Sequence, residues 1–423
     1  MWGRFVGAAA LDPGLGCYVF AYDRTFARGG IELAPLHMPL DANERTYAFP
    51  ALPEATYYRL PALLADALPD DFGNALIDRW LAERGVPRAA ITPLDRLAYM
   101  GRRAMGALEF RPQRGPATRK PTAIHLGELV TAAREAIAGT WHDDDSTAAA
   151  LRTIIEVGTS AGGARAKAVV AWNPLTHEMR SGQLEAPDGY EQWLLKFDGV
   201  GRDRELGSGE DYGRIEFAYH RMARAAGIAM TDCQLLEENG RAHFMTRRFD
   251  RDGRERHHVQ TLCAMAHLDF RRRGTNSYAQ LFHTIRELRL PREDLVEAWR
   301  RMAFGVMARN CDDHTKNISF RLRRGEGWRL APAYDVTFAH NPLGEWTNQH
   351  LMSVNGRFRD ITADDLLAEA DRFAIGEAKA ILAEIRAALA RWPEFAAAAG
   401  LATAASDRIG ALHIPLGDGG GRR

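Results

Sequence analysis

The chain has 423 residues, 46% of them hydrophobic and 26% charged, with 55 Lys+Arg against 55 Asp+Glu. This length exceeds what one hydrophobic core usually serves and predicts two or three structural units. The zero net charge argues against an autonomous nucleic-acid-binding protein, although the run Arg271-Arg272-Arg273 remains a candidate contact. The 4 cysteines have no metal-binding spacing, and no apolar run reaches the ~18 residues of a membrane span. Since the sequence shows no signal peptide either, we expect a cytoplasmic protein without membrane contact.

The first part of the chain predicts a small α+β module. Short strand-like pieces at residues 17–22 and 31–33 are separated by Gly, Pro and Asp, and residues 60–84 have helical periodicity. Residues 112–122 contain three prolines and predict a linker. The acidic run at 142–146 suits a loop or helix cap before a helix at 147–155 better than a metal site, because Asp and Ser favour helix starts.

The middle and the end of the chain predict a mixed segment followed by helices. We expect strands at 168–172, 191–197 and 242–245 and a helix at 214–228. Beyond about residue 250 the pattern is mainly helical, apart from a β-hairpin at 318–330 that a glycine-containing turn closes. The last two helices are expected near 363–370 and 374–391, before a tail at 417–423.

The segment 310–317 reads Asn-Cys-Asp-Asp-His-Thr-Lys-Asn and places Asp312 and Asn317 five positions apart. This is the spacing of a kinase catalytic loop, in which the Asp accepts the proton of the substrate hydroxyl and the Asn holds a metal ion. The predicted hairpin would return Asp335 beside Asn317, so that two oxygen ligands converge on cations bridging nucleotide phosphates. A solvated polar loop is the alternative, but the second Asp after a hairpin favours phosphotransfer.

A glycine-rich segment at 158–167 precedes the strand predicted at 168–172. Glycines let backbone N–H groups approach phosphate oxygens, although this segment matches neither common nucleotide-binding glycine motif and alone suggests a flexible turn. It is followed by Lys196 in a mostly apolar strand and by Glu216 on a helix, which is the order of the ATP-binding lobe of protein kinases. For Lys196, the alternative is a lysine on an edge strand that discourages pairing with another strand. For Glu216, the alternative is an ordinary surface carboxylate.

Together these motifs resemble the HipA family, bacterial Ser/Thr protein kinases that act as toxins in toxin–antitoxin modules. Residues 63–70 are similar to the family's L-L-P-D helix end, 160–167 to its S-x-A-G-A-Q-x-K loop, 312–317 to its D-G-H-x-K-N and 333–336 to its Y-D-[VI]. The resemblance covers most of the chain. It implies an α+β, two-lobed protein-kinase-like (HipA-like) fold with an N-terminal α+β subdomain (1–110), an ATP-binding N-lobe (123–250) and a helical C-lobe with the catalytic loop (251–415).

The resemblance also implies the roles of individual residues. Asp312 would be the catalytic base, and Asn317 and Asp335 would bind Mg²⁺. Residues 247–250 resemble the family's E-R-F-D, where the chain crosses between lobes and meets adenine. ATP would be held by Gly162, Gly163, Ala164, Arg165, Ala166, Lys167, Lys196, Arg247, Phe249, His314, Lys316, Asn317, Tyr334 and Asp335. For His314, an imidazole that fixes the loop is an alternative that does not exclude a nucleotide contact.

Regulation and partners follow from the same resemblance. Ser160 matches the serine that family members autophosphorylate, and a phosphate there would add about −1.5 to −2 charges where the loop must receive ATP phosphates. A turn cap by Ser160 and phosphorylation of Thr159 instead are the alternatives. The family binds a helix-turn-helix antitoxin (HipB-like), so DNA contact would be indirect. An aminoacyl-tRNA synthetase is the protein substrate that the resemblance suggests.

Several positions depart from the family pattern. Arg165 replaces Gln in the loop, where Ala161 and Gly163 also shift the small residues, and Arg247 replaces the hinge Glu. Asp313 replaces Gly beside the expected base, and two adjacent acids can raise one another's pKa. Residues 260–265 differ from the usual Q-E-D stretch. These departures suit a divergent subgroup with a different target.

Two other functions stay open at this point. One is a catalytically weak, kinase-fold regulatory or binding protein that works with a DNA-binding antitoxin. The other is a small-molecule kinase, because no residue in the sequence specifies the acceptor and a fold alone does not settle function. The joint presence of Asp312, Asn317, Asp335 and Lys196 favours an active enzyme, because folding alone requires none of them.

Overall fold

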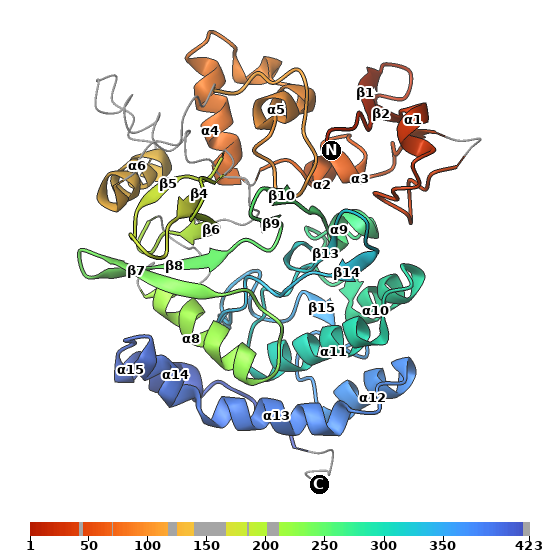
Figure 1. Ribbon diagram of the computed structural model, residues 1–423. Coiled ribbons are helices and arrows are strands. Elements are labelled where there is room, and N and C mark those ends of the chain that lie inside the picture. Colours follow the sequence, from red (N-terminus) through yellow and green to blue (C-terminus); the bar gives the residue numbers. More distant parts are fainter. Residues whose placement is uncertain are drawn as a thin grey trace. The chain divides into compact units, whose positions relative to one another are not determined.

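A computed structural model describes residues 1–41, 45–69, 71–116, 125–138, 166–183, 186–200 and 211–417 (Figure 1). The chain falls into two compact units, which are described one at a time. The first comprises Met1–Gly201, Met245–His267 and Arg321–Gly327, and the second comprises Arg202–Phe244, Leu268–Phe320 and Trp328–Arg423. The acidic run, the helix predicted at 147–155, the glycine-rich loop through Arg165 and most of the expected linker and tail lie outside the described residues.

The first unit begins with an antiparallel sheet of order β1-β2-β3, formed by β1 (Gly7–Asp12), β2 (Cys17–Tyr22) and β3 (Thr46–Ala48). Its first turn is fixed because the Asp12 side chain accepts the N–H groups of Gly14 and Leu15 at 2.8 and 3.0 Å. The strand predicted at 17–22 is confirmed. The strand predicted at 31–33 is wrong: this segment is irregular, and Leu33 is fully buried without strand pairing.

Helices follow this sheet within the first unit. The helical prediction over 60–84 is confirmed by α3 (Ala62–Ala65) and α4 (Asp71–Ala82). Helix α5 (Pro93–Met100) begins at a capping box in which Thr92 and Asp95 exchange hydrogen bonds. The remaining helices of this region are α1 (Arg24–Ala27), α2 (Glu54–Tyr57), η1 (Arg88–Ala90) and α6 (Leu126–Ala138).

A second antiparallel sheet of the first unit contains β5 (Met179–Ser181), β4 (Lys167–Trp172) and β6 (Glu191–Lys196), in the order β5-β4-β6. Next to β6 lies β8 (Arg241–Arg247), whose residues from Met245 onward belong to this unit. The strands predicted at 168–172, 191–197 and 242–245 are confirmed. Short elements complete the unit: β9 (Arg251–Asp252), β10 (Glu255–Arg256), β11 (His258–Thr261) and α9 (Leu262–Met265).

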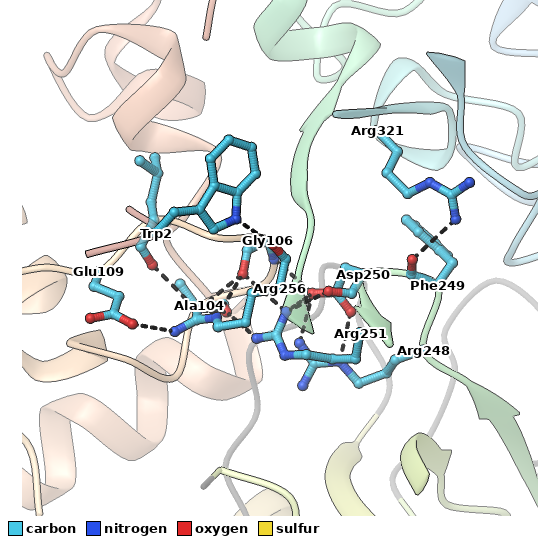
Figure 2. A network of polar contacts seen from close by, with 11 residues as sticks. Trp2, Ala104, Gly106, Glu109, Arg248, Phe249, Asp250, Arg251, Arg256 and Arg321 are labelled. Atoms are coloured by element: carbon cyan, nitrogen blue, oxygen red, sulfur yellow. Dashed lines mark hydrogen bonds and ion pairs between the residues drawn. The ribbon is translucent and has the colours of Figure 1, made fainter. Parts of the chain in front are cut away.

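A buried ion network joins distant parts of the first unit, as Figure 2 shows. The Asp250 carboxylate is fully buried and accepts hydrogen bonds from Arg248, from Arg251 and from the Gly106 N–H at 2.7–2.9 Å. Arg256 donates to the Gly106 carbonyl at 3.0 Å and pairs with Glu109 at 3.0 Å. Burial disfavours the charge on Asp250, but Arg248 and Arg251 outweigh burial and hold the Asp250 pKa well below its usual range.

The second unit is mainly helical. Its first elements are α8 (Tyr212–Ala225), which confirms the helix predicted at 214–228, and β7 (Cys233–Glu238), which no sequence pattern indicated. Its other elements are β12 (Asn276–Ser277), α10 (Tyr278–Glu287), α11 (Arg292–Met307), η2 (Thr315–Asn317), β13 (Ser319–Leu322, whose residues from Arg321 onward belong to the first unit), β14 (Trp328–Leu330), β15 (Met352–Ser353), α12 (Ala363–Phe373), α13 (Ala378–Ala390), α14 (Trp392–Ala398) and α15 (Thr403–Gly410). The prediction that the helices end near 391 is wrong, because α14 and α15 follow.

Helix α11 packs against α10, α13 and β14 in the second unit. Its Trp299 is fully buried and donates a hydrogen bond to the Leu366 carbonyl on α12 at 3.3 Å. Its Asp294 accepts two hydrogen bonds from Arg329 and one from the Leu330 N–H, which fixes β14 against the helix. The predicted hairpin is confirmed by β13 and β14. None of the helices in the described ranges combines the length and the apolar composition needed to cross a membrane.

Candidate active site

The segment that carries Asp312 leaves the C-terminal end of α11 and is fixed on both sides by backbone contacts. The Cys311 N–H donates to the Ala339 carbonyl at 2.9 Å, and the Ala339 N–H donates to the Arg309 carbonyl at 3.1 Å. Farther along, the Thr315 hydroxyl donates to the Leu268 carbonyl at 2.8 Å. The loop between α11 and η2 is therefore held by segments that are remote in sequence.

Asp313 is the strongest anchor of this loop. It is 6% exposed, and its carboxylate accepts hydrogen bonds from the Tyr278 hydroxyl at 2.9 Å, from His350 Nδ1 at 2.8 Å and from the Leu351 N–H at 2.6 Å. Burial disfavours the charged form of His350, but the Asp313 carboxylate and Cys311 outweigh burial and raise the His350 pKa to about 10. Asp313 thus serves as a buried, paired carboxylate, whereas Asp312 beside it has a side chain that is 46% exposed.

Cys311 extends this buried cluster. Its Sγ lies 3.9 Å from His350 Nε2 and 3.8 Å from His340 Nδ1. Burial opposes the charged thiolate, but His350 and the contact with His340 outweigh burial and lower the Cys311 pKa. The sequence analysis did not identify His350, Tyr278 or the anchoring role of Asp313. The one feature of the sequence that pointed to this role was the Asp at position 313, where the family has Gly.

A small cavity of about 60 Å³ brings together residues from both ends of the hairpin. Its polar lining includes Asn310, Asp312, Asp313, Asn317, Tyr334 and Asp335. The Asn317 amide nitrogen donates to the Asp312 carbonyl at 2.7 Å, which orients its side chain at the cavity. The Tyr334 hydroxyl donates to the Lys316 carbonyl at 2.7 Å and ties the segment after the hairpin to η2. Asn317 and Asp335, 18 positions apart in the sequence, therefore line one cavity.

Asp335 has a left-handed backbone conformation, with φ of +54°. Non-glycine residues in this region store strain, of order 1–3 kcal/mol, and they cluster at functional sites where the surrounding structure over-determines them. Asp is among the residues that tolerate this conformation best. The strained backbone marks Asp335 as a position where side-chain placement matters.

The donor set of the cavity fits a hard divalent cation that also binds phosphate. Carboxylate and amide oxygens from Asp335 and Asn317 are suitable, and Asn310 adds a buried amide oxygen that has no hydrogen-bond partner among the described residues. Mg²⁺ takes one or two carboxylates and completes its coordination with water and substrate phosphates, so Asp335 with the two amide oxygens fits this ion.

His314 and Lys316 lie beside the cavity on the same loop. His314 Nε2 lies 3.7 Å from an Asp312 carboxylate oxygen, and its ring packs against Phe270 at a centroid distance of 5.3 Å. The Lys316 ammonium lies 4.9 Å from the centre of the Phe270 ring. His314 Nδ1 is buried and has no hydrogen-bond partner among the described residues. The structure thus brings Asp312, His314, Lys316, Asn317, Tyr334 and Asp335 together in the second unit.

The lysines expected at the phosphates lie in the first unit. The register of β4 and β6 places Lys167 directly opposite Lys196, so the two side chains leave the same face of the sheet. Like charges at such positions destabilise a sheet unless an anion compensates them. The edge-strand interpretation of Lys196 is wrong, because β6 lies between β4 and β8.

The other predicted residues are divided between the two units. Arg247, at the end of β8, pairs with Glu191 at 3.3 Å, and the Phe249 carbonyl accepts from Arg321 at 3.2 Å (Figure 2). Glu216 lies on α8 in the second unit and is only 3% exposed, so its interpretation as a surface carboxylate is wrong. Ala166 is fully buried just before β4. Ser160, Gly162, Gly163, Ala164 and Arg165 lie outside the described residues.

Comparison with known proteins gives matches along most of the chain. The HipA-like C-terminal domain model matches residues 159–392, and the HipA N-terminal domain model matches residues 1–111. HipA in the complex of the Shewanella oneidensis MR-1 toxin–antitoxin system HipA, HipB and its operator DNA is 15% identical, with a TM-score of 0.65 over 96% of this chain and 92% of that chain. The Helicobacter pylori proinflammatory kinase CtkA is 11% identical, with a TM-score of 0.34 over 54% of this chain and 90% of that chain. No curated protein matches the sequence. The expected α+β, HipA-like fold is confirmed.

Proposed function

The chain belongs to the HipA family, and from this membership we propose that it is an ATP-dependent Ser/Thr protein kinase, the toxin of a toxin–antitoxin module. The observation that carries the proposal is the cavity that Asp312, Asn317 and Asp335 line together. A base, an amide oxygen and a carboxylate at one place are the parts that phosphoryl transfer from a nucleotide requires.

Each of the three residues has its own role in this proposal. Asp312, with its partly exposed carboxylate, accepts the proton of the acceptor hydroxyl, while Asn317 and Asp335 hold Mg²⁺. The ion, when bound, neutralises charge on the transferred phosphate. Asp313 keeps the loop in place through its three hydrogen bonds. Asp312 is therefore the base and Asp313 a positioning residue, although the two acids are adjacent.

The proposed ATP site extends beyond the cavity, because about 60 Å³ suits an ion with few waters rather than a nucleotide. Lys167 and Lys196, paired across β4 and β6, supply positive charge for the phosphates together with the loop from Gly162 to Ala166. Glu216 is proposed to orient Lys196. Arg247, Phe249, His314, Lys316 and Tyr334 are proposed to contact the rest of the nucleotide.

Regulation and partners are proposed from the family. The structural relative from Shewanella oneidensis forms a complex with HipB and operator DNA, which supports a HipB-like helix-turn-helix antitoxin as the partner of this chain. We propose inhibitory autophosphorylation at Ser160, where a phosphate would repel incoming ATP. The proposed target is a translation component such as an aminoacyl-tRNA synthetase.

Incubation of the purified protein with γ-labelled ATP, Mg²⁺ and cell lysate tests the proposed function. We expect label on a protein band other than the kinase itself, and none when Asp312 is replaced by Asn. Label on a small metabolite alone would show a small-molecule kinase. Absence of label together with tight antitoxin binding would leave a binding protein that uses the kinase fold without its chemistry.

A further inference from the structure

A turn rich in arginine lies beside the catalytic loop in the second unit and has no role in the proposed chemistry. It consists of Phe270, Arg271, Arg272 and Arg273, between α9 and β12, and is called the arginine turn below. Arg271 and Arg272 are exposed, while Phe270 and Arg273 are half-buried. Among the residues that the structure describes, Arg272 and Arg273 form no ion pair with a carboxylate, although Arg292 and Arg329 in the same unit do.

The arginine turn is attached directly to the catalytic loop. The carbonyl of Leu268, just before the turn, accepts the Thr315 hydroxyl at 2.8 Å. The Phe270 ring packs against the His314 ring at a centroid distance of 5.3 Å, and the Arg271 guanidinium lies 5.1 Å from the centre of the same ring. Because His314 in turn lies 3.7 Å from Asp312, only two side chains separate the proposed base from Arg271.

The turn is also held at its far end, so its backbone and the Arg273 side chain have fixed positions. Arg273 donates to the Asn348 side chain at 3.2 Å and lies over the Trp346 ring at 5.7 Å. The Arg271 N–H donates to the Asp269 side chain at 2.9 Å, and the Thr275 hydroxyl donates to the Arg272 carbonyl at 2.8 Å. Arg272 and Arg273 are adjacent cations that repel one another, and an anionic partner reduces this repulsion.

We propose that the arginine turn binds acidic side chains of the protein that accepts the phosphate. This inference rests on the proposed kinase function and adds the class of acceptor: a hydroxyl flanked by Asp or Glu. Because Phe270 and His314 lie between Arg271 and Asp312 in this chain of contacts, the acidic residues are expected on the same short peptide segment as the hydroxyl. Opposite charges on the turn and on the acceptor protein increase the association rate and the affinity, and this effect weakens as the salt concentration rises.

Binding and transfer are measured separately with two labelled peptides that share a central serine, one with flanking Glu and one with Gln at the same positions. Anisotropy gives the peptide affinity and labelled ATP gives KM and kcat. For the wild-type protein we expect the Glu peptide to bind about tenfold more tightly, because it forms exposed charge pairs that the Gln peptide cannot form. The double variant Arg271→Glu/Arg272→Glu should lose this preference with kcat unchanged.

The control is Lys379→Glu/Arg408→Glu, which makes the same charge change at exposed positions of α13 and α15. It should bind the Glu peptide as the wild type does. Equal affinity of the wild type for both peptides would overturn the inference, as would an equal loss in the control. A single-stranded RNA that displaces the Glu peptide from the wild type with higher affinity would assign the turn to nucleic acid and overturn the inference too. Peptide binding without any phosphate transfer would instead contradict the proposed kinase function.

Discussion

At the scale of single residues, Asp335 combines two features that rarely coincide by chance. Its backbone is left-handed, and its side chain lies at the cavity that Asn317 also lines. The proposed function assigns this carboxylate to the metal ion, and a strained backbone of this kind is what a functionally placed side chain tolerates.

Replacing Asp335 by Ala should weaken Mg²⁺-dependent nucleotide binding strongly. A direct ligand is lost, so the expected loss exceeds the 10–100-fold that removal of an outer-shell partner typically costs. Calorimetry with Mg²⁺ and ATP measures it, and Asp364→Ala, at an exposed position of α12, is the control. An unchanged affinity in Asp335→Ala would place the metal elsewhere.

Residue spacing predicted part of this site and could not predict the rest. Asp312, Asn317 and Asp335 follow from a short motif and a hairpin, both of which are local in sequence. His350 lies 37 positions after Asp313, and Tyr278 lies 35 positions before it. No periodicity connects residues at such separations, so the cluster that anchors the loop becomes visible only when the chain is folded.

The Asp313–His350 pair makes stability depend on pH in a defined direction. The His350 pKa is raised from 6.5 to about 10, so the folded state binds this proton more tightly than the unfolded state. The resulting stabilisation is fully present below about pH 6.5 and is lost as the pH rises toward 10. We expect Asp313→Asn to be less stable than the wild type by several kcal/mol near pH 6, with the difference shrinking toward pH 10.

Denaturant unfolding of both proteins across this pH range tests the pair. Subtracting the two free energies of unfolding removes the contributions of other titrating groups that the variants share. A difference that stays constant from pH 6 to pH 10 would contradict the account. It would mean that Asp313 stabilises the loop without changing the protonation of His350.

At the scale of secondary-structure elements, the Asp250 network links the segment after β8 to the loop around Gly106 (Figure 2). Asp250→Asn breaks a buried pair and should cost about 3–5 kcal/mol of unfolding free energy at neutral pH. Because the Asp250 pKa is depressed, this stabilisation is present above the ordinary Asp pKa of 3.8 and is lost as the pH falls below it.

Asp188→Asn is the matched control for this prediction. Asp188 pairs with Arg254 at 3.5 Å, but its side chain is 96% exposed. Exposed pairs contribute about 0–1 kcal/mol, so the control should unfold almost as the wild type does. Equal effects of the two substitutions would show that the buried network is not a main support of the first unit.

Elements with clear periodicity were predicted well, and elements set by long-range contacts were not. The strands at β2, β4, β6 and β8, the helix α8 and the hairpin follow from apolar spacing and turn residues. The short strands β12 and β15 pair in parallel across 76 positions, from Asn276 to Met352, and have too few residues to carry a pattern. At residues 31–33 the error is the opposite one, since a strand was predicted where none forms. Leu33 is buried, but the segment has no strand pairing.

At the scale of the whole molecule, the proposed autophosphorylation at Ser160 of the glycine-rich loop makes a testable prediction. The protein expressed alone should carry phosphate at Ser160, and the modified form should bind ATP poorly because the added negative charge repels the nucleotide phosphates. Mass spectrometry of the wild type beside Asp312→Asn measures this. An active enzyme without phosphate at Ser160 or Thr159 would contradict self-inhibition through this loop.

The account as a whole depends on Asp312 as the base of a phosphotransferase. Asn at this position keeps the size of the side chain but cannot accept the proton of the acceptor hydroxyl, and loss of a general base typically costs about 10²–10⁴-fold in rate. The most direct measurement is the rate of γ-phosphate transfer from ATP to protein by the wild type and by Asp312→Asn, with ATP affinity measured in parallel. We expect transfer to fall at least about 100-fold in Asp312→Asn with ATP affinity near normal. Close to wild-type transfer by Asp312→Asn, or no transfer by either protein, would contradict the account.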